Sequence, residues 1–280
     1  MQINSNNKRV LIISSKGGVG KSTISMQLIA PYLYEKSQKT VSFYDFDDEN
    51  NDSLSYGGSG LTKREIIEVD QSIIKENIMD IFSRDESACL DIGGNKTTTI
   101  FLEALADTGM IHYVDLAIIP LLDGEQDAIN SSIIYTTLKD LDKDLKIIFV
   151  LNRAKNHRYI HYQFDNFFGD PRGILSNTNC VQTNLFEEDY DKYVVMLDDD
   201  IIKYSRRFGM TIYEIAHMER DYSKFLKLSK NEFSKEQDVK LASFKNYIQR
   251  ASVTYYEDVI VPAFTKIDAI MESKNDNEAT

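Results

Sequence analysis

The stretch of sequence that decides the fold runs Val10-Leu-Ile-Ile-Ser-Ser-Lys-Gly-Gly-Val-Gly-Lys-Ser-Thr23. Its first residues are apolar, its middle is rich in glycine, and its end fits the start of a helix. Gly17, Gly18 and Gly20 carry no Cβ, so successive backbone N–H groups can converge on one anion. The following helix adds the positive end of its dipole to the same place. The stretch therefore predicts a phosphate-binding loop between a strand and a helix.

The residues that close this loop carry the side chains that a nucleotide triphosphate needs. Lys21 is placed to lie between the β- and γ-phosphates, and the Ser22 hydroxyl is placed to ligate Mg²⁺. The hydroxyl and backbone of Thr23 are placed to reach the α-phosphate. We therefore expect a nucleotide and Mg²⁺ as ligands.

The loop departs from the usual P-loop pattern at one position. Six residues before Lys21 that pattern has glycine, whereas this chain has Ser15, followed by Lys16. The string Lys-Gly-Gly-Val-Gly-Lys-Ser-Thr resembles the deviant Walker A motif of the ParA/MinD family of ATPases. The resemblance implies an ATP-dependent homodimer in which Lys16 reaches the nucleotide of the other subunit, as an arginine finger does elsewhere. Loop and resemblance together predict the ATP-binding residues Lys16, Gly17, Gly18, Val19, Gly20, Lys21, Ser22 and Thr23, of which Lys16 and Lys21 act in catalysis.

Aspartates follow in the order that the resemblance implies. The segment Phe43-Tyr-Asp-Phe-Asp-Asp-Glu-Asn50 is similar to the family's switch I, in which Asp47 orients or activates the attacking water. Asp45 is then expected to contact the Mg²⁺ shell or the P-loop lysine. The chain departs from the family here, because Asp-Glu replaces Pro-Gln after Asp47. Asp91, in Ala88-Cys-Leu-Asp-Ile-Gly-Gly94, fits a Walker B aspartate that holds Mg²⁺ through a water.

Two later segments extend the resemblance, which covers residues 9–216. Ile147-Ile-Phe-Val-Leu-Asn-Arg153 is similar to the family strand that ends in an adenine-reading asparagine, so Asn152 is the base-binding candidate. Residues 193–216 are similar to the family's C-terminal pattern. The looser sequence around Asp91 looks more like the plasmid-stability and conjugation ATPases of the StbB/TraL sort within the ParA-like branch.

Short apolar runs alternate with helical patterns along the chain, which predicts a doubly wound α/β fold with a mostly parallel sheet. We expect a single domain over residues 1–280, with a core at 9–216 and a C-terminal helical extension at 217–273. Pro31 should kink or end the first helix. The expected strands are 10–14, 41–44, 88–92, 116–120, 147–151 and 193–197. The expected helices are 22–35, 63–82, 97–108, 125–139 and 157–168, with two to four more within 211–271.

Composition limits the cellular setting. No apolar stretch approaches the length needed to cross a membrane, and the first nine residues are polar, so we expect no membrane insertion and no secretory signal. The chain has two cysteines, far apart; Cys89 lies in an apolar run and is expected to be a buried thiol. These features favour a cytoplasmic protein, associated with the nucleoid if it binds DNA.

The net charge of −12 means that any contact with DNA requires a local basic patch. Residues 220–250 carry eight basic side chains against four acidic ones. The resemblance implies non-specific DNA binding in this neighbourhood, plasmid segregation or cargo positioning, and a ParB-like or other adaptor that stimulates hydrolysis. The predicted DNA-binding residues are Arg206, Arg207, Lys224, Lys227 and Lys230.

Two other functions remain open. One is a MinD-like ATPase that acts on a membrane or a protein client, although the polar and acidic C-terminus lacks a basic amphipathic helix. The other is a small-molecule metabolic enzyme of the same fold, against which Lys16 argues.

Overall fold

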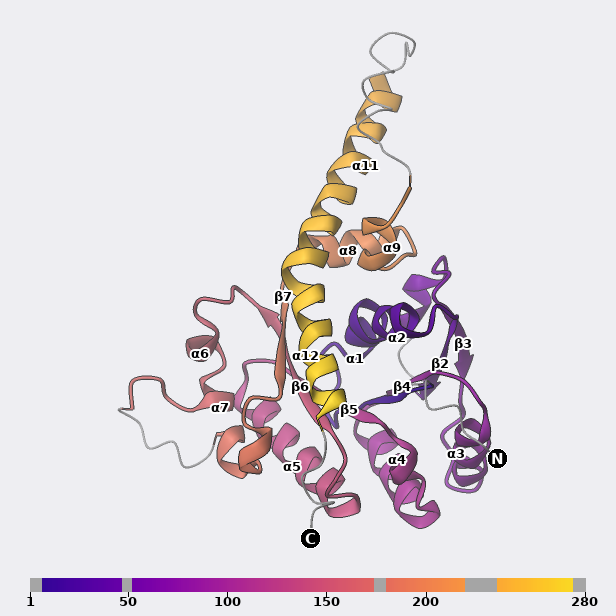
Figure 1. The fold of residues 1–280 in the computed structure, drawn as a ribbon, viewed down its shortest axis with the longest axis vertical. Coiled ribbons are helices and arrows are strands. Elements are labelled where there is room, and N and C mark those ends of the chain that lie inside the picture. Colours follow the sequence, from indigo (N-terminus) through magenta and orange to yellow (C-terminus); the bar gives the residue numbers. More distant parts are fainter. Residues whose placement is uncertain (1–6, 47–51, 174–179, 220–235, 274–280) are drawn as a thin grey trace.

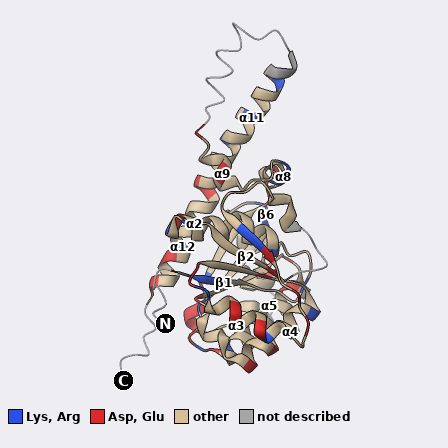
Figure 2. Cartoon of the chain, turned by 90° about the vertical axis from the view of Figure 1, so that its right-hand side faces the viewer, with Lys and Arg blue, Asp and Glu red and all other residues tan. Residues whose placement is uncertain are grey.

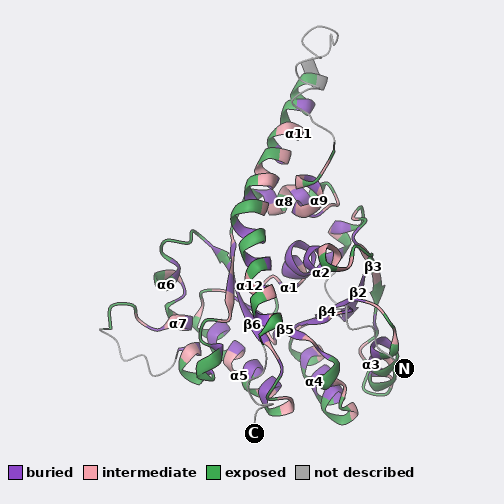
Figure 3. Cartoon of the chain, viewed as in Figure 1, coloured by how far each residue is buried: buried purple, intermediate pink, exposed green. Residues whose placement is uncertain are grey.

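The computed structural model of the protein describes residues 7–46, 52–173, 180–219 and 236–273. Seven parallel strands form one sheet in the order β3-β2-β4-β1-β5-β6-β7, which confirms the predicted doubly wound α/β class. The central strands are buried on both faces, and their apolar runs show little polar alternation for this reason (Figure 3). The strands are β1 Arg9–Ile12, β2 Val41–Phe46, β3 Thr62–Ile66, β4 Ala88–Ile92, β5 Leu116–Leu121, β6 Ile147–Ala154 and β7 Tyr193–Leu197.

Helices cover both faces of this sheet (Figure 1). One face, which includes Leu11 and Ile13, packs against α3 Ile74–Ser83, α4 Asn95–Thr108 and α5 Glu125–Leu141. The other face, which includes Val10 and Ile12, packs against the helices that carry the P-loop and the C-terminal region. These are α1 Lys21–Ile24, α2 Ala30–Ser37, α8 Asp200–Arg207, α9 Ile212–Ala216, α11 Glu236–Tyr255 and α12 Val261–Glu272.

The C-terminal helices contribute directly to the second layer. Ile260, Phe264 and Ile267 are buried in the same cluster as the sheet residues, so α12 covers the sheet beside α2. In contrast, α11 runs away from the body and exposes much of its surface (Figures 1 and 3). Within the described residues, every helix is too short or too polar to cross a bilayer.

The first helical segment continues past Pro31, where the sequence predicts a kink or an end. A π-turn at Ser25–Ile29 joins α1 to α2, and the helix continues to Ser37. Proline has no N–H for the carbonyl four residues back, and the wider turn before it relieves this mismatch. The same pairing recurs before Pro262, where the π-turn Tyr256–Ile260 precedes α12.

The predicted helix over residues 63–82 is wrong in its first half. Thr62–Ile66 forms the edge strand β3, which pairs with β2 in register Phe43↔Arg64, and only Ile74–Ser83 is helical. Because β3 lies at an edge, it carries charged, partly exposed side chains and lacks the apolar run of a central strand. Figure 2 faces this edge and shows its basic and acidic residues.

The predicted helix over 157–168 is also wrong, because it is divided into α6 Ile160–Gln163 and α7 Asp165–Phe168. Phe164 leaves the helical conformation between them, with φ −108° and ψ 45°. It is buried, as is Phe167, whose ring packs edge-on against that of Phe149 in β6. Burying these aromatic rings against the sheet stabilises the fold more than continuing the helix through Phe164 would.

Candidate functional site

The glycine-rich loop leaves β1 and enters α1 as the sequence predicts. Gly18 and Gly20 have φ of 78° and 93°, a region that other residues rarely adopt. A Cβ at Gly17 would meet no atom within 4 Å, whereas a Cβ at Gly20 would lie 2.2 Å from Asn152 Nδ2. The loop is therefore open on one side and held against β6 on the other.

Lys21 is the first residue of α1 and is buried. Its Nζ donates to the carbonyl oxygen of Lys16 at 3.3 Å, so the ammonium lies beneath its own loop. Ser22 and Thr23 follow on the first turn of α1, and Val19 is buried just before it. The structure thus brings the predicted phosphate-binding residues together around one loop.

Asn152, the base-binding candidate, packs against this loop. Its Nδ2 donates to the carbonyl of Val19 at 2.8 Å, and its Oδ1 accepts from the N–H of Arg153 at 3.0 Å. Arg153 has φ 56°, and the pairing of β6 with β7 shifts register between Leu151 and Ala154. This bulge turns Asn152 toward the P-loop. That Asn152 reads adenine stays a prediction.

Lys16, the residue that distinguishes the loop, contacts a carboxylate of its own chain. Its Nζ lies 2.8 Å from Asp127 Oδ2, in the first turn of α5. The Lys16 side chain is 39% exposed, but that of Asp127 is only 4% exposed. Among the described residues, Asp127 Oδ1 has no hydrogen-bond partner, so Lys16 is the main compensation for this buried charge.

Asp45 and Asp91 lie side by side on neighbouring strands of the sheet. They are register partners on β2 and β4, and both are buried. Asp45 Oδ2 accepts from Arg64 Nε at 3.1 Å, from Arg64 Nη2 at 2.7 Å and from Ser53 Oγ at 2.5 Å. Arg64 is not among the predicted site residues, because the sequence predicts a helix where β3 lies.

This donor set fits Mg²⁺ in one arrangement. Buried carboxylate and hydroxyl oxygens are the ligands that Mg²⁺ prefers, and Asp91 and Ser22 supply them. Asp45 already accepts three hydrogen bonds on one oxygen, so it fits a place in the water shell of the ion better than direct ligation. Asp47 lies outside the described residues.

The thiol of Cys89, next to this carboxylate pair, is neutral and unreactive. Cys89 is buried on β4, and burial, followed by the charge of Asp91, raises the pKa of its thiol well above the usual value. Both Cys89 and Cys180 are buried and free, as expected for Cys89. A neutral thiol at this depth serves packing.

The two arginines predicted to bind DNA point in different directions. Arg207 is exposed at the end of α8, and its guanidinium lies 5.8 Å from the ring centre of Tyr204. Arg206 is half-buried and turns inward, where it donates to Thr23 and Tyr56. Lys224, Lys227 and Lys230 lie outside the described residues. DNA binding by these residues stays a prediction.

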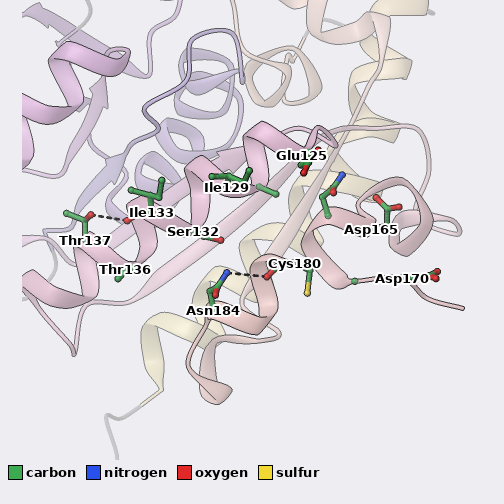
Figure 4. A pocket seen from close by; sticks show the side chains of 13 residues that line it. Glu125, Ile129, Ser132, Ile133, Thr136, Thr137, Asp165, Asp170, Cys180 and Asn184 are labelled. Atoms are coloured by element: carbon green, nitrogen blue, oxygen red, sulfur yellow. Dashed lines mark hydrogen bonds between the residues drawn. The ribbon is translucent and has the colours of Figure 1, made fainter. Parts of the chain in front are cut away.

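A separate groove lies between α5 and α7 (Figure 4). Its volume is about 720 Å³, and Ile129 and Ile133 of α5 line it with exposed apolar side chains. Glu125, Asp165 and Asp170 add acidic groups along it. None of the P-loop residues lines this groove, so it is distinct from the phosphate site.

Comparisons with solved structures find similar chains at low identity. MinD in a MinC:MinD cell division complex from Aquifex aeolicus is 14% identical, with a TM-score of 0.50 over 73% of this chain and 87% of that one. A variant of McdA from Cyanothece, in complex with ATP, is 16% identical, with a TM-score of 0.46 over 76% and 91%. The Mg-ADP complex of MinD from Pyrococcus horikoshii OT3 is 16% identical, with a TM-score of 0.45 over 93% and 98%.

No curated protein matches the sequence. The family model of the CobQ/CobB/MinD/ParA nucleotide-binding domain matches residues 10–168, more than half of the chain. This range includes the P-loop, both buried aspartates, Asp127 and Asn152. The chain therefore belongs to the CobQ/CobB/MinD/ParA family of nucleotide-binding domains.

Proposed function

We propose that this protein is an ATP-hydrolysing switch that works as an ATP-dependent homodimer. The observation that carries the proposal is the position of Lys16, on the exposed side of the phosphate loop and 2.8 Å from Asp127. A lysine that served only its own nucleotide would not be needed there, because Lys21 already fills the place beneath the loop. The Lys16 side chain is 39% exposed, so its ammonium can leave Asp127 and turn outward, toward a facing subunit.

Each residue of the loop then has a defined task. Backbone N–H groups and Lys21 bind the β- and γ-phosphates, and Thr23 binds the α-phosphate. Ser22 and Asp91 would hold Mg²⁺, with Asp45 in its water shell, and the ion would neutralise charge on the phosphates. Asp47 orients the attacking water, so Asp47→Ala is expected to trap an ATP-bound dimer.

Lys16 and Asp127 set the threshold for pairing. When the Lys16 ammonium moves to the partner's phosphates, Asp127 keeps a buried negative charge without its main counter-charge. Part of the energy gained at the partner's nucleotide is lost in this way. The ion pair therefore favours the monomer until ATP is bound.

Light scattering after gel filtration tests this arrangement. Lys16→Ala should abolish the ATP-dependent dimer while ATP binding by the monomer persists. Asp127→Asn removes the ion pair that opposes dimerisation. Because a charged hydrogen bond contributes about 1.5 kcal/mol, the protein concentration at half-dimerisation should fall by about tenfold. An ATP dimer of unchanged stability in Lys16→Ala would contradict the trans role.

We further propose that the ATP dimer binds DNA without sequence preference, and that an adaptor of the ParB type stimulates hydrolysis. Exposed basic residues on α11, Lys240 and Arg250, support a basic surface on this helix. A gel-shift assay with unrelated duplex DNA, with and without ATP, tests it. Retardation should require ATP and weaken steeply as salt rises.

A protein client is the second candidate. Ile129 and Ile133 are 44% and 58% exposed on α5, the same helix that begins beside the Lys16–Asp127 pair. Apolar side chains at a groove favour contact with another protein. An ATP-dependent dimer that fails to shift DNA at any salt concentration would select this candidate.

A further inference from the structure

A half-buried arginine from the C-terminal region lies against the phosphate-binding helix. Arg206, in the last turn of α8, donates from Nη2 to Thr23 Oγ1. Its Nε donates to the Tyr56 hydroxyl at 3.1 Å. Thr23 and Tyr56 are both buried. The guanidinium therefore lies at the first turn of α1, next to the residue expected to reach the α-phosphate.

A buried polar network fixes this position. Gln27 Nε2 donates to the Tyr56 hydroxyl at 2.9 Å and to Ser205 Oγ at 2.7 Å. Gln27 Oε1 accepts from the N–H of Ile212 at 2.8 Å. Gln27 is fully buried, so these contacts join the π-turn after α1 to both α8 and α9. Arg206 is thus held in place before any ligand arrives.

The charge of Arg206 has no counter-charge among the described residues, where no carboxylate lies within 4 Å of it. Among these residues, two of its five N–H groups donate hydrogen bonds, one to Tyr56 and one to Thr23. Arg64 pairs with Asp45, and Arg84 pairs with Glu65. A half-buried cation that has no carboxylate near it in the described part of the chain is costly, so Arg206 favours the binding of an anion.

The chemistry of Thr23 indicates which anion. A hydroxyl has one proton to donate and lone pairs that accept. In Thr23 a lone pair accepts from Arg206, so the proton is directed elsewhere. We propose that Arg206 positions the α-phosphate of the bound nucleotide: it orients the Thr23 hydroxyl toward that phosphate and places positive charge beside it. The inference rests on the proposed function in taking the ligand to be a nucleotide.

Binding of fluorescent ATP and ADP analogues to the full chain tests the role. Both nucleotides carry an α-phosphate, so Arg206→Met should weaken both by the same factor, about tenfold or more. Arg206→Lys, which keeps the charge but loses the fork, should fall between. Lys203→Met, an exposed residue on the same helix, is the matched control and should bind as the wild type does.

A double-mutant cycle separates this role from simple packing. If Arg206 acts through the Thr23 hydroxyl, the effects of the two substitutions should not add. The double variant Thr23→Val, Arg206→Met should then bind nucleotide only slightly more weakly than the weaker-binding single variant. An Arg206→Met protein that melts earlier but binds ADP like the wild type would overturn the inference. A loss confined to ATP would also overturn it, because it would place Arg206 at the γ-phosphate. Wild-type protein that binds neither nucleotide would instead overturn the proposed function.

Discussion

Gly20→Ala tests whether the phosphate loop is held in shape by its contact with β6. Gly20 has φ 93°, and an added Cβ would lie 2.2 Å from Asn152 Nδ2. An L-residue with positive φ costs about 1–2 kcal/mol, and overpacking a tight site costs about 1–3 kcal/mol. Displacing Asn152 also weakens its bonds to Val19 and Arg153. We expect a total loss of about 2–5 kcal/mol in the free energy of unfolding.

Equilibrium unfolding in urea without nucleotide measures this loss. Gly17→Ala is the matched control, because a Cβ there meets no atom within 4 Å and the φ of Gly17 is ordinary. It should change stability by less than about 1 kcal/mol. In an Asn152→Ala background the clash with the Asn152 side chain is removed. Gly20→Ala should then lower the free energy of unfolding by only about 1–2 kcal/mol. The reasoning fails if Gly20→Ala costs as much in that background as in the wild type.

Two other perturbations probe buried charges. Arg64→Met should destabilise the protein by about 3 kcal/mol because it leaves the buried Asp45 without its guanidinium, whereas Lys63→Met on the exposed face of β3 should stay within about 0.5 kcal/mol in the same urea assay. Burial alone would raise the pKa of Asp189, but hydrogen bonds, led by that from Lys192, outweigh it and lower the pKa. This stabilisation is full above the ordinary carboxyl pKa of about 4 and is lost as pH falls through the lowered value. Asp189→Asn should therefore lower the free energy of unfolding by about 2–4 kcal/mol at pH 7. If the variant and the wild type differed in stability by the same amount at about pH 2.5, the assignment would be wrong.

Much of the fold follows from local pattern. Apolar runs predict six of the seven strands, because strands covered on both faces must be apolar along their length. The strand ends are harder to predict: β2 continues to Phe46, so Asp45 lies within the strand and not after it. The seventh strand, β3, is not predicted because an edge strand needs no such run.

The site divides in the same way. The glycines, Lys21, Ser22 and Thr23 are neighbours in sequence, so the amino-acid order alone indicates their chemistry. Arg64 lies in the segment that the sequence wrongly assigns to a helix. The inward turn of Arg206 has no sequence signal, since Arg206 and Arg207 look alike in the chain. Asp127 could have been identified as a site candidate from the sequence, because it lies in the first turn of a helix that follows an apolar strand.

The sequence by itself determined the phosphate loop, the α/β class and the family resemblance, because each depends on residues within a few positions of one another. The tertiary structure alone decided which charges meet. Lys16 contacts Asp127 across 111 positions, and Arg206 contacts Thr23 across 183. Such contacts depend on the order of the strands and the packing of helices on the sheet, which no local pattern encodes.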